Sequence, residues 1–416
     1  MTTLSVRRSA ARRRTALVAA LLGVSLSTPR LGAQARDSTA RADSARAQRA
    51  RVDADTVPFV RGGIYDKPFM TRLAGRTAIG GYAEAHARYQ RVDGLPDESG
   101  FEAKRFNLFV NTRVSDFVRL GAELEFEDGG RDISIEFAAV DLRIHSSFNL
   151  RGGMLLSPLG RFNLSHDSPL NEFTDRPLVS TEVLGVALSE PGFGAFGQFG
   201  AGGRGRVTYE VYATNGFHDG LISASAEGTR IPLGRDNLED NNGSPAVVGR
   251  LAWSPRSGYE IGLSAHHGAY NVFNQEGAAV DERRNVTISV VDAEATVAGV
   301  RLTAEAALAH VDVPAGLTGI YSSNQRGFFA EAVRNFGRGW VRTIPASVFA
   351  LKARVDMVDF DTDMIGQSTS QLSVGVNFRP TQDSVVKLDY VRGRGRDRFN
   401  NPREHAFLLA SVATYF

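Results

Sequence analysis

The stretch RLGAELEFEDGG, residues 119–130, alternates between acidic and apolar side chains. Successive side chains of a β-strand point to opposite faces, so an extended chain here has two unlike faces. One face carries the three glutamates and the other the apolar residues: Glu123, Glu125 and Glu127 against Leu120, Ala122, Leu124 and Phe126. Such a strand separates water from an apolar medium, which is either the core of a soluble sheet or a lipid bilayer.

Segments with the same two-residue period recur through the rest of the chain. They are roughly 9 to 14 residues long, which is enough to cross a bilayer at a tilt. The clearest cover residues 103–114, 118–127, 132–145, 206–216, 347–360, 371–380 and 384–394. Beyond the first 35 residues, no apolar run approaches the length of a membrane helix. The pattern therefore indicates a chain that crosses a membrane with strands.

The connections between these segments alternate in length. Short ones are expected at 114–117, 145–148, 254–258, 298–300 and 379–384, and longer polar ones at 95–100, 156–192, 216–244 and 395–404. Pairing them predicts an all-β protein, a transmembrane antiparallel β-barrel of about 16 strands over residues 71–416, with long external loops. A β-sandwich or a propeller is the alternative, although neither requires this alternation. The final run FLLASVATYF, residues 407–416, ends on an aromatic residue, as expected at the interfacial girdle of such a barrel.

The first 35 residues have the order of a secretory signal peptide. Five arginines precede a short apolar run, and Ala33-Gln34-Ala35 has the small-x-small pattern of a cleavage site. A basic arm that binds nucleic acid is the alternative, but it would not need that site. Residues 36–70 then form a low-complexity periplasmic tether, because residues 36–57 hold almost no large apolar side chain. A short coiled coil there would lack its apolar seam.

Charge and cysteine content narrow the possible partners. The leader holds six arginines and no acidic residue, so without it the formal charge falls from +2 to −4. The mature chain therefore has no general attraction to nucleic acid. Cysteine is absent, so an exported chain must be stabilised by a large core or a closed sheet.

A longer run resembles a known family. Residues 150–185 and 190–197 combine a strand, a proline-glycine turn and a polar series in a long loop, with Pro158, Gly160, Asn163, His166, Pro169, Arg176 and Pro177 at the matching positions. Further matches lie at 80–82, 123–125, 377–380 and 387–390. Together they resemble the phosphate-selective porins O and P from Tyr82 to Phe416. The resemblance implies a sixteen-stranded outer-membrane barrel, a homotrimer, and a third long loop folded into the lumen.

The residues of that loop fit an inward position. A loop inside a barrel must satisfy its backbone with polar partners, and this one carries both charge signs. The predicted pore-constriction residues are Arg161, Asn163, His166, Asp167, Glu172, Asp175 and Arg176. The alternative is a loop packed over the outer rim.

Alternation also predicts which charged side chains face the lumen. The basic ones are Arg105, Arg113, Arg119, Arg301, Lys352, Arg354 and Lys387, and the acidic ones are Glu123, Glu125, Glu127, Glu136, Glu305, Asp356 and Asp389. The two sets balance, so we expect an outer-membrane porin for passive diffusion of small polar or ionic solutes, in contact with outer-membrane lipids and lipopolysaccharide. The alternatives are a phosphate- or anion-selective channel, which needs a basic lumen, and a non-channel barrel that serves as an envelope anchor or receptor.

Other chemistry has weak support, and neither catalysis, a cofactor nor a metal is expected. Ser165, His166 and Asp167 have the residue types of a hydrolase triad, but three adjacent residues cannot align as one. Asp359, Asp361 and Asp363 begin like a calcium loop, which lacks its glycine and its closing glutamate. GGRGR at 202–206 joins two strands and is interpreted as a flexible turn.

Overall fold

The computed structural model describes residues 71–72, 76–200 and 202–416. The predicted signal peptide, residues 1–35, and the predicted tether, residues 36–70, lie outside the described residues and stay predictions. Within the described chain, no helix has both the length and the apolar character needed to cross a membrane.

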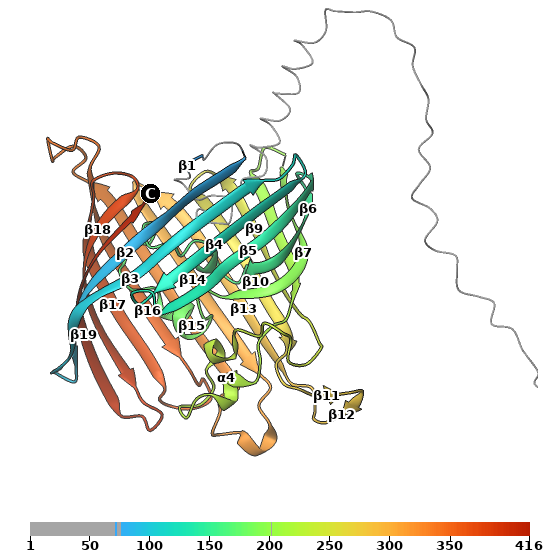
Figure 1. The fold of residues 1–416 in the computed structure, drawn as a ribbon. Coiled ribbons are helices and arrows are strands. Elements are labelled where there is room, and N and C mark those ends of the chain that lie inside the picture. The colour runs from blue at the N-terminus through green and yellow to red at the C-terminus, as the bar shows by residue number, and fades with distance from the viewer. Residues whose placement is uncertain (1–70, 73–75, 201) are drawn as a thin grey trace, which may run out of the picture. The chain divides into compact units, whose positions relative to one another are not determined.

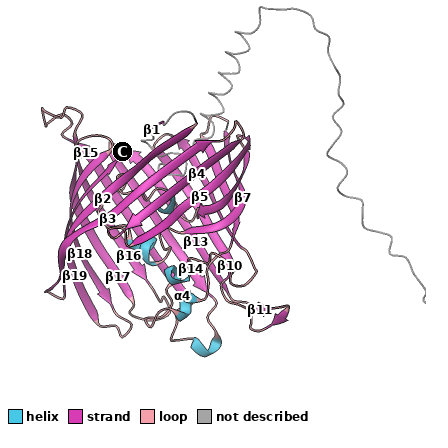
Figure 2. Ribbon diagram, in the orientation of Figure 1, coloured by secondary structure: helices cyan, strands magenta, loops and turns pink. Residues whose placement is uncertain are grey.

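Sixteen antiparallel strands close into one barrel (Figures 1 and 2). In chain order they are β2 (Thr77–Val92), β3 (Leu95–Arg113), β4 (Val118–Glu127), β5 (Asp132–His145), β6 (Phe148–Leu156), β7 (Ser189–Gly200), β8 (Arg206–Thr214), β9 (Ala246–Arg256), β10 (Tyr259–Ala269), β13 (Asn285–Val297), β14 (Val300–Val311), β15 (Asn324–Phe336), β16 (Val348–Asp359), β17 (Ser368–Arg379), β18 (Ser384–Arg396) and β19 (Pro402–Tyr415). Each strand pairs with its successor, and β19 pairs with β2, so the predicted fold class is confirmed.

The barrel closes where its first and last strands meet (Figure 1). Tyr82 lies opposite Tyr415, and beyond that pair Gly81 and Phe416 exchange backbone hydrogen bonds of 3.0 and 3.2 Å. A Cβ atom on residue 81 would lie 2.1 Å from the carbonyl oxygen of Asn107, so only glycine fits at this seam. The two-residue strand β1 (Thr71–Arg72) then pairs with β2 beyond the end of β19.

The two faces of β4 lie as the alternation predicts. Leu120 and Leu124 are 36% and 38% exposed on the outer surface, whereas Glu123 and Glu125 are buried on the inside. The same division repeats around the barrel, because each of the sixteen strands carries at least one exposed large apolar or aromatic side chain. Near the end of the barrel that holds the short turns, Phe336, Trp340, Phe349 and Phe378 form a chain of ring contacts. This outer surface has the composition that a bilayer requires.

One predicted connection is wrong. Residues 95–100 were expected to form a longer polar loop, but they belong to β3, and the real turn is Asp93-Gly94 with positive φ at both positions. Two-residue turns of this type suit the twist of paired strands. The proline, acidic residues and glycine of 95–100 are typical of a loop. In the structure, however, these residues extend β3, which pairs with β2 as a polar hairpin.

The third and fourth connections at the loop end fold into the barrel (Figure 2). The third, residues 157–188, contains α2 (Arg161–Leu164) and α3 (Leu178–Glu182). The fourth, residues 215–245, contains α4 (Gly220–Ser223) and the 3-10 turn η1 (Ile231–Gly234). The remaining short elements, the hairpin β11 (Asn274–Gln275) and β12 (Ala278–Ala279) and the 3-10 turn η2 (Ala315–Leu317), lie in other loops.

Candidate functional site

The third loop contacts the inner wall of the barrel on several sides. The backbone N–H of Gly160 donates to Ser264 on β10 at 2.8 Å, and that of Phe162 donates to Glu305 on β14 at 3.0 Å. Farther along the loop, the N–H of Thr174 donates to Asp389 on β18 at 2.8 Å. These partners come from strands spread around the wall, so the loop lies across the lumen.

An apolar cluster fixes one part of this loop. Val179 and Val183 are fully buried in and after α3, and they belong to the same core as Leu221 and Ile231 of the fourth loop. Inward side chains of β9, β13 and β14 complete the cluster, including Val248, Val286, Ile288 and Ala307. The third and fourth loops therefore fill part of the lumen with a dry core. Sequence reasoning predicted only the third loop inside the barrel.

Charged pairs fix the part that precedes α3. Lys387 of β18 donates to the carbonyl oxygens of Ser168 at 2.9 Å and Phe173 at 3.2 Å. Lys352 of β16 lies 2.5 Å from Asp389 and 4.5 Å from the centre of the Phe173 ring. The tip of the loop is therefore held by lysines whose own charge is balanced by the wall.

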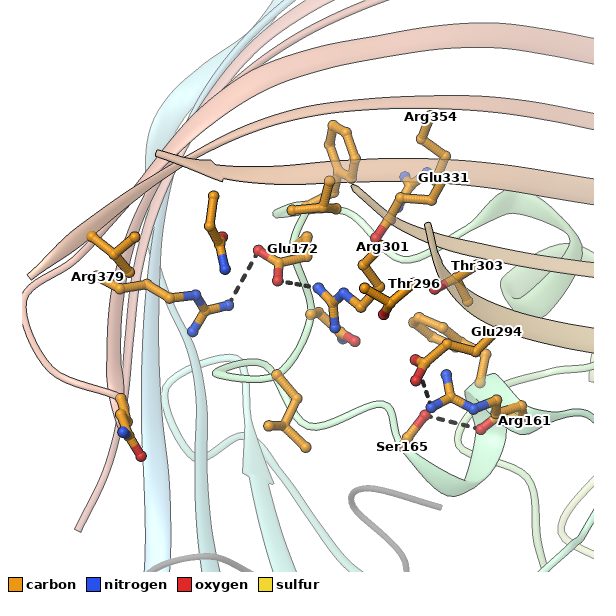
Figure 3. Close-up of a pocket in the computed structure, with 18 of the residues that line it drawn as sticks. Arg161, Ser165, Glu172, Glu294, Thr296, Arg301, Thr303, Glu331, Arg354 and Arg379 are labelled. Carbon is orange, nitrogen blue, oxygen red and sulfur yellow. Dashed lines mark hydrogen bonds and ion pairs between the residues drawn. The ribbon is translucent and has the colours of Figure 1, made fainter. Parts of the chain in front are cut away.

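Glu172 is the centre of the charged contacts (Figure 3). Its carboxylate pairs with Arg301 of β14 and with Arg379 of β17, the latter at 3.2 Å, and it accepts a hydrogen bond from Asn377 at 2.7 Å. Burial raises the pKa of this carboxyl, but the charges of Arg379 and Arg301 and the hydrogen bonds from Arg379 and Asn377 outweigh that effect and lower the pKa to about 2. Glu172 is thus ionised at neutral pH and joins the loop to two strands.

The other predicted constriction residues also lie in the lumen. Asn163 donates to the carbonyl oxygens of Ser157 and Leu188 and accepts from the N–H of Leu188, so it holds the two ends of the loop together. Arg161 pairs with Glu294 at 2.8 Å, and Asp175 pairs with Arg88 at 2.6 Å. Burial and nearby Arg105 lower the pKa of Arg176. The structure places these predicted residues inside the barrel, and their role in constricting a pore stays a prediction.

The adjacent serine, histidine and aspartate point to separate partners. Ser165 donates to the carbonyl oxygen of Arg161 at 3.0 Å. The His166 Nδ1 contacts the carbonyl oxygen of Asn163 at 2.7 Å, and its Nε2 lies 2.8 Å from Glu136. Asp167 accepts a hydrogen bond from Tyr415 at 2.9 Å. These contacts bind the loop to β5 and β19, and they do not align the three side chains for nucleophilic attack.

Most predicted lumen-facing charges form pairs along the inner wall. Arg105 pairs with Glu84, Glu125 and Glu127, and Asn107 donates to Glu123, Glu125 and Glu136. Arg354 lies 2.9 Å from Asp356, which in turn accepts from the N–H of Leu178. Arg113 pairs with Asp116 in a turn, and Arg119 lies opposite Asp141, so both lie near the turn end, away from the loop.

A cavity of about 660 Å³ lies between the third loop and the turn end of β13 to β17 (Figure 3). Its charged lining comprises Arg161, Arg301, Arg338, Arg354 and Arg379 together with Glu172, Asp175, Glu294 and Glu331. Five guanidinium groups face four carboxylates, so the lining is mixed with a small cationic excess. Sequence reasoning missed Glu294, Glu331, Arg338 and Arg379. The alternation that placed Arg301 inward could have found Glu294, Glu331 and Arg379.

Two other motifs lie outside this site. In the acidic turn, the N–H of Asp361 donates to Asp359 at 3.3 Å and the N–H of Asp363 donates to Asp361 at 3.1 Å, while Asp359 pairs with Arg326. The carboxylates therefore organise their own turn. GGRGR lies in the connection between β7 and β8, where Gly202, Gly203 and Gly205 have positive φ, as expected of a turn.

Comparisons with known proteins agree with this geometry. No protein-family model matches the chain. An uncharacterised protein of Aquifex aeolicus is 25% identical over 353 residues, covering 78% of this chain and 77% of that one. Among solved structures, the outer membrane channel DcaP of Acinetobacter baumannii has a TM-score of 0.54 at 14% identity, covering 83% and 99% of the two chains.

Two more barrels give similar values. OmpF of Salmonella typhi, solved in complex with daunomycin, has a TM-score of 0.54 at 11% identity and covers 84% and 100% of the two chains. OprB of Pseudomonas putida has a TM-score of 0.54 at 10% identity and covers 82% and 94%. At these identities the similarity concerns the fold, which is the sixteen-stranded barrel of outer-membrane porins.

Proposed function

We propose that this protein is an outer-membrane porin, a water-filled channel through which small polar or ionic solutes diffuse passively. The observation that carries the proposal is the charged cavity between the third loop and the turn end of β13 to β17. A barrel used only as an anchor has no need of nine charged side chains around an internal cavity. The proposal includes export through a cleaved signal peptide, and it involves no catalysis and no cofactor.

The charge balance of the cavity favours weak selectivity. Arg301 and Arg379 share the carboxylate of Glu172, and Arg161 pairs with Glu294, so these guanidinium groups are already paired. A selective anion filter needs cationic groups that remain available to the ion. A general channel with a small anion preference therefore fits better than a phosphate-selective one, although the sequence resembles phosphate-selective porins. The same resemblance supports a homotrimer.

Single-channel recording in a planar bilayer tests the proposal. The purified mature protein should give steady ohmic conductance in potassium chloride, and a salt gradient should give a small reversal potential of the sign expected for anions. If phosphate blocked the chloride current at low concentration, the protein would be a phosphate-selective channel and not a general one. No conductance from a folded, inserted barrel would overturn the channel and favour an anchor or receptor, with the dry core of the third and fourth loops as a plug.

A further inference from the structure

The outer surface of the barrel carries a group of arginines at the loop end of β18. Along this strand the buried and exposed residues alternate strictly from Val385 to Arg394. The exposed series begins with Val386, Leu388 and Tyr390 and continues with Arg392, Arg394 and Arg396. The three guanidinium groups therefore leave the barrel on the same face as the apolar side chains, outside the lumen.

A fourth arginine joins them from β2. Arg91 lies opposite Ala406 of β19, and Ala406 lies opposite Arg392, so the two arginines flank one alanine in the same row. Arg91, Arg392, Arg394 and Arg396 are all exposed, and we refer to them as the arginine patch. The row next to it, toward the turn end, holds Tyr390, Leu408 and Tyr89, which are all exposed on the outer surface.

This order of rows locates the arginine patch relative to a bilayer. Tyrosines at the border of the apolar surface mark the membrane interface in such barrels. Each step of two residues along a strand advances about 7 Å, and a tilted strand rises less than that. The arginine patch therefore begins immediately above the tyrosine row, at the depth of the outer-leaflet headgroups.

The arginine patch has little internal compensation. Glu404 is the acidic neighbour, 3.7 Å from Arg392, and both side chains are more than 60% exposed. Arg396 donates to Asn400 and Arg91 donates to the carbonyl oxygen of Gly94, so these two hydrogen bonds use neutral acceptors. Among the described residues, Arg394 forms no ion pair. By contrast, the outward Arg326 on β15 is paired with Asp359 at 3.0 Å.

We propose that the arginine patch binds the phosphate groups of an anionic lipid of the outer leaflet. Arginine presents several donors that match phosphate oxygens, and the four groups, on the two strands that flank β19, can contact a headgroup that carries two phosphates. The acyl chains of that lipid would lie along Leu388, Val386 and Leu408. A free phosphate ion fits less well, because the patch continues the apolar surface that acyl chains cover.

The inference rests on the outer-membrane location proposed above, and it is independent of conductance, because the arginine patch lies outside the lumen. Failure of the two proposals is therefore distinguishable. A variant without the arginine patch should conduct as the wild type does, and a barrel that did not conduct could still bind the lipid.

Binding of diphosphoryl lipid A to the folded, detergent-solubilised protein tests the inference, with native mass spectrometry as the readout. Basic side chains near an anionic lipid surface contribute about fivefold in affinity each. R394Q should therefore weaken binding about fivefold, and R91Q/R392Q/R394Q/R396Q about six-hundredfold. R334Q is the matched control, because Arg334 is exposed on β15 near the turn end of the barrel and should not matter.

Three results would overturn the inference: equal binding of wild type and quadruple variant, equal loss in R334Q, or equal affinity for dephosphorylated lipid A. Displacement of the lipid by low millimolar inorganic phosphate would mean that the arginine patch is a site for the free ion. The heat-modifiable gel shift of a folded barrel checks each variant. If the quadruple variant does not fold, two other measurements test the inference in its place. R394Q should still weaken binding, and the affinity of the wild type should fall as the salt concentration rises.

Discussion

The third loop is fixed inside the barrel by two regions with opposite chemistry. The apolar region contains Val179, Val183 and Leu184, which pack in the dry core shared with the fourth loop. The charged region is centred on Glu172, which is bound by Arg301, Arg379 and Asn377. The stability of the apolar region depends on the apolar area that it buries and little on the orientation of the side chains. The stability of the charged region depends on the presence of each ionic partner and on its protonation state. One loop therefore has a permanent attachment and a titratable one.

The largest effect should follow from placing a charge in the apolar region. Val179→Asp removes a fully buried side chain that packs against Gly327 of β15 and buries an unpaired carboxyl, costing about 5 kcal/mol of loop docking. Hydrogen exchange of residues 157–188 should rise and single-channel conductance should increase. Val280→Asp, at an exposed position of another loop, should change neither. An unaltered exchange pattern in Val179→Asp would mean that the apolar region does not hold the loop.

Breaking the charged region should cost less. Glu172→Gln leaves Arg301 and Arg379 without their carboxylate, and a pKa shift from 4.5 to about 2 corresponds to about 3 kcal/mol. The variant should also become more anion-selective, because two guanidinium groups lose their compensation. Reversal potential in a salt gradient and exchange of residues 166–176 measure both effects. Glu239→Gln, in the fourth loop at an exposed position, is the control. Equal selectivity and equal loop exchange in the two variants would contradict the role assigned to Glu172.

Lowering the pH should weaken the charged region of the wild-type protein, as the Glu172→Gln substitution does. The folded pKa of Glu172 is below its ordinary value, so its contribution is complete above about pH 4.5 and declines as pH falls toward 2. At pH 3 the loss is about 2 kcal/mol. Loop exchange, corrected for the intrinsic pH dependence, should increase over this window in the wild type and not in Glu172→Gln. A response of equal size in both proteins would assign it to other carboxyls.

The smallest effect concerns the cavity itself. Arg338 is exposed in the turn after β15 and lines the cavity, so Arg338→Gln should lower the chloride-to-potassium permeability ratio by less than about fivefold, the effect of a 1 kcal/mol interaction in water. Arg334→Gln removes the same charge from the outer surface four residues away and should leave the ratio unchanged. An equal shift in both variants would show that surface charge, and not the cavity lining, sets the preference.

The two regions also differ in how far the sequence reveals them. Alternation predicted the strands well, and residues 118–127 and 132–145 coincide with β4 and β5. It also predicted the inward face, because Glu123 and Lys352 lie inside the barrel. A period of two specifies a face but not a partner, so the sequence could not show that Glu172 meets Arg379 across the lumen.

The apolar region was harder to predict for a different reason. Phe217, the adjacent pair Leu221 and Ile222, and Ile231 are spaced irregularly along a mostly polar loop and form no regular pattern. Their common environment arises only when the fourth loop folds back onto α3, which is a property of the closed barrel. A polar connection of this length therefore looks external from the sequence, although it supplies part of the dry core.

The seam between β2 and β19 has a consequence for biogenesis. The N–H of Glu404 donates to Asp93, 311 residues earlier in the sequence, and Phe416 pairs with Gly81 at the other end of the same seam. Contacts between such distant residues slow folding, because the whole intervening chain must be ordered before they form. Until β19 arrives, β2 presents an open edge that can pair with other chains. The nascent protein therefore keeps this edge open until β19 pairs with β2, and a chain truncated before β19 should retain an edge with which other chains can pair.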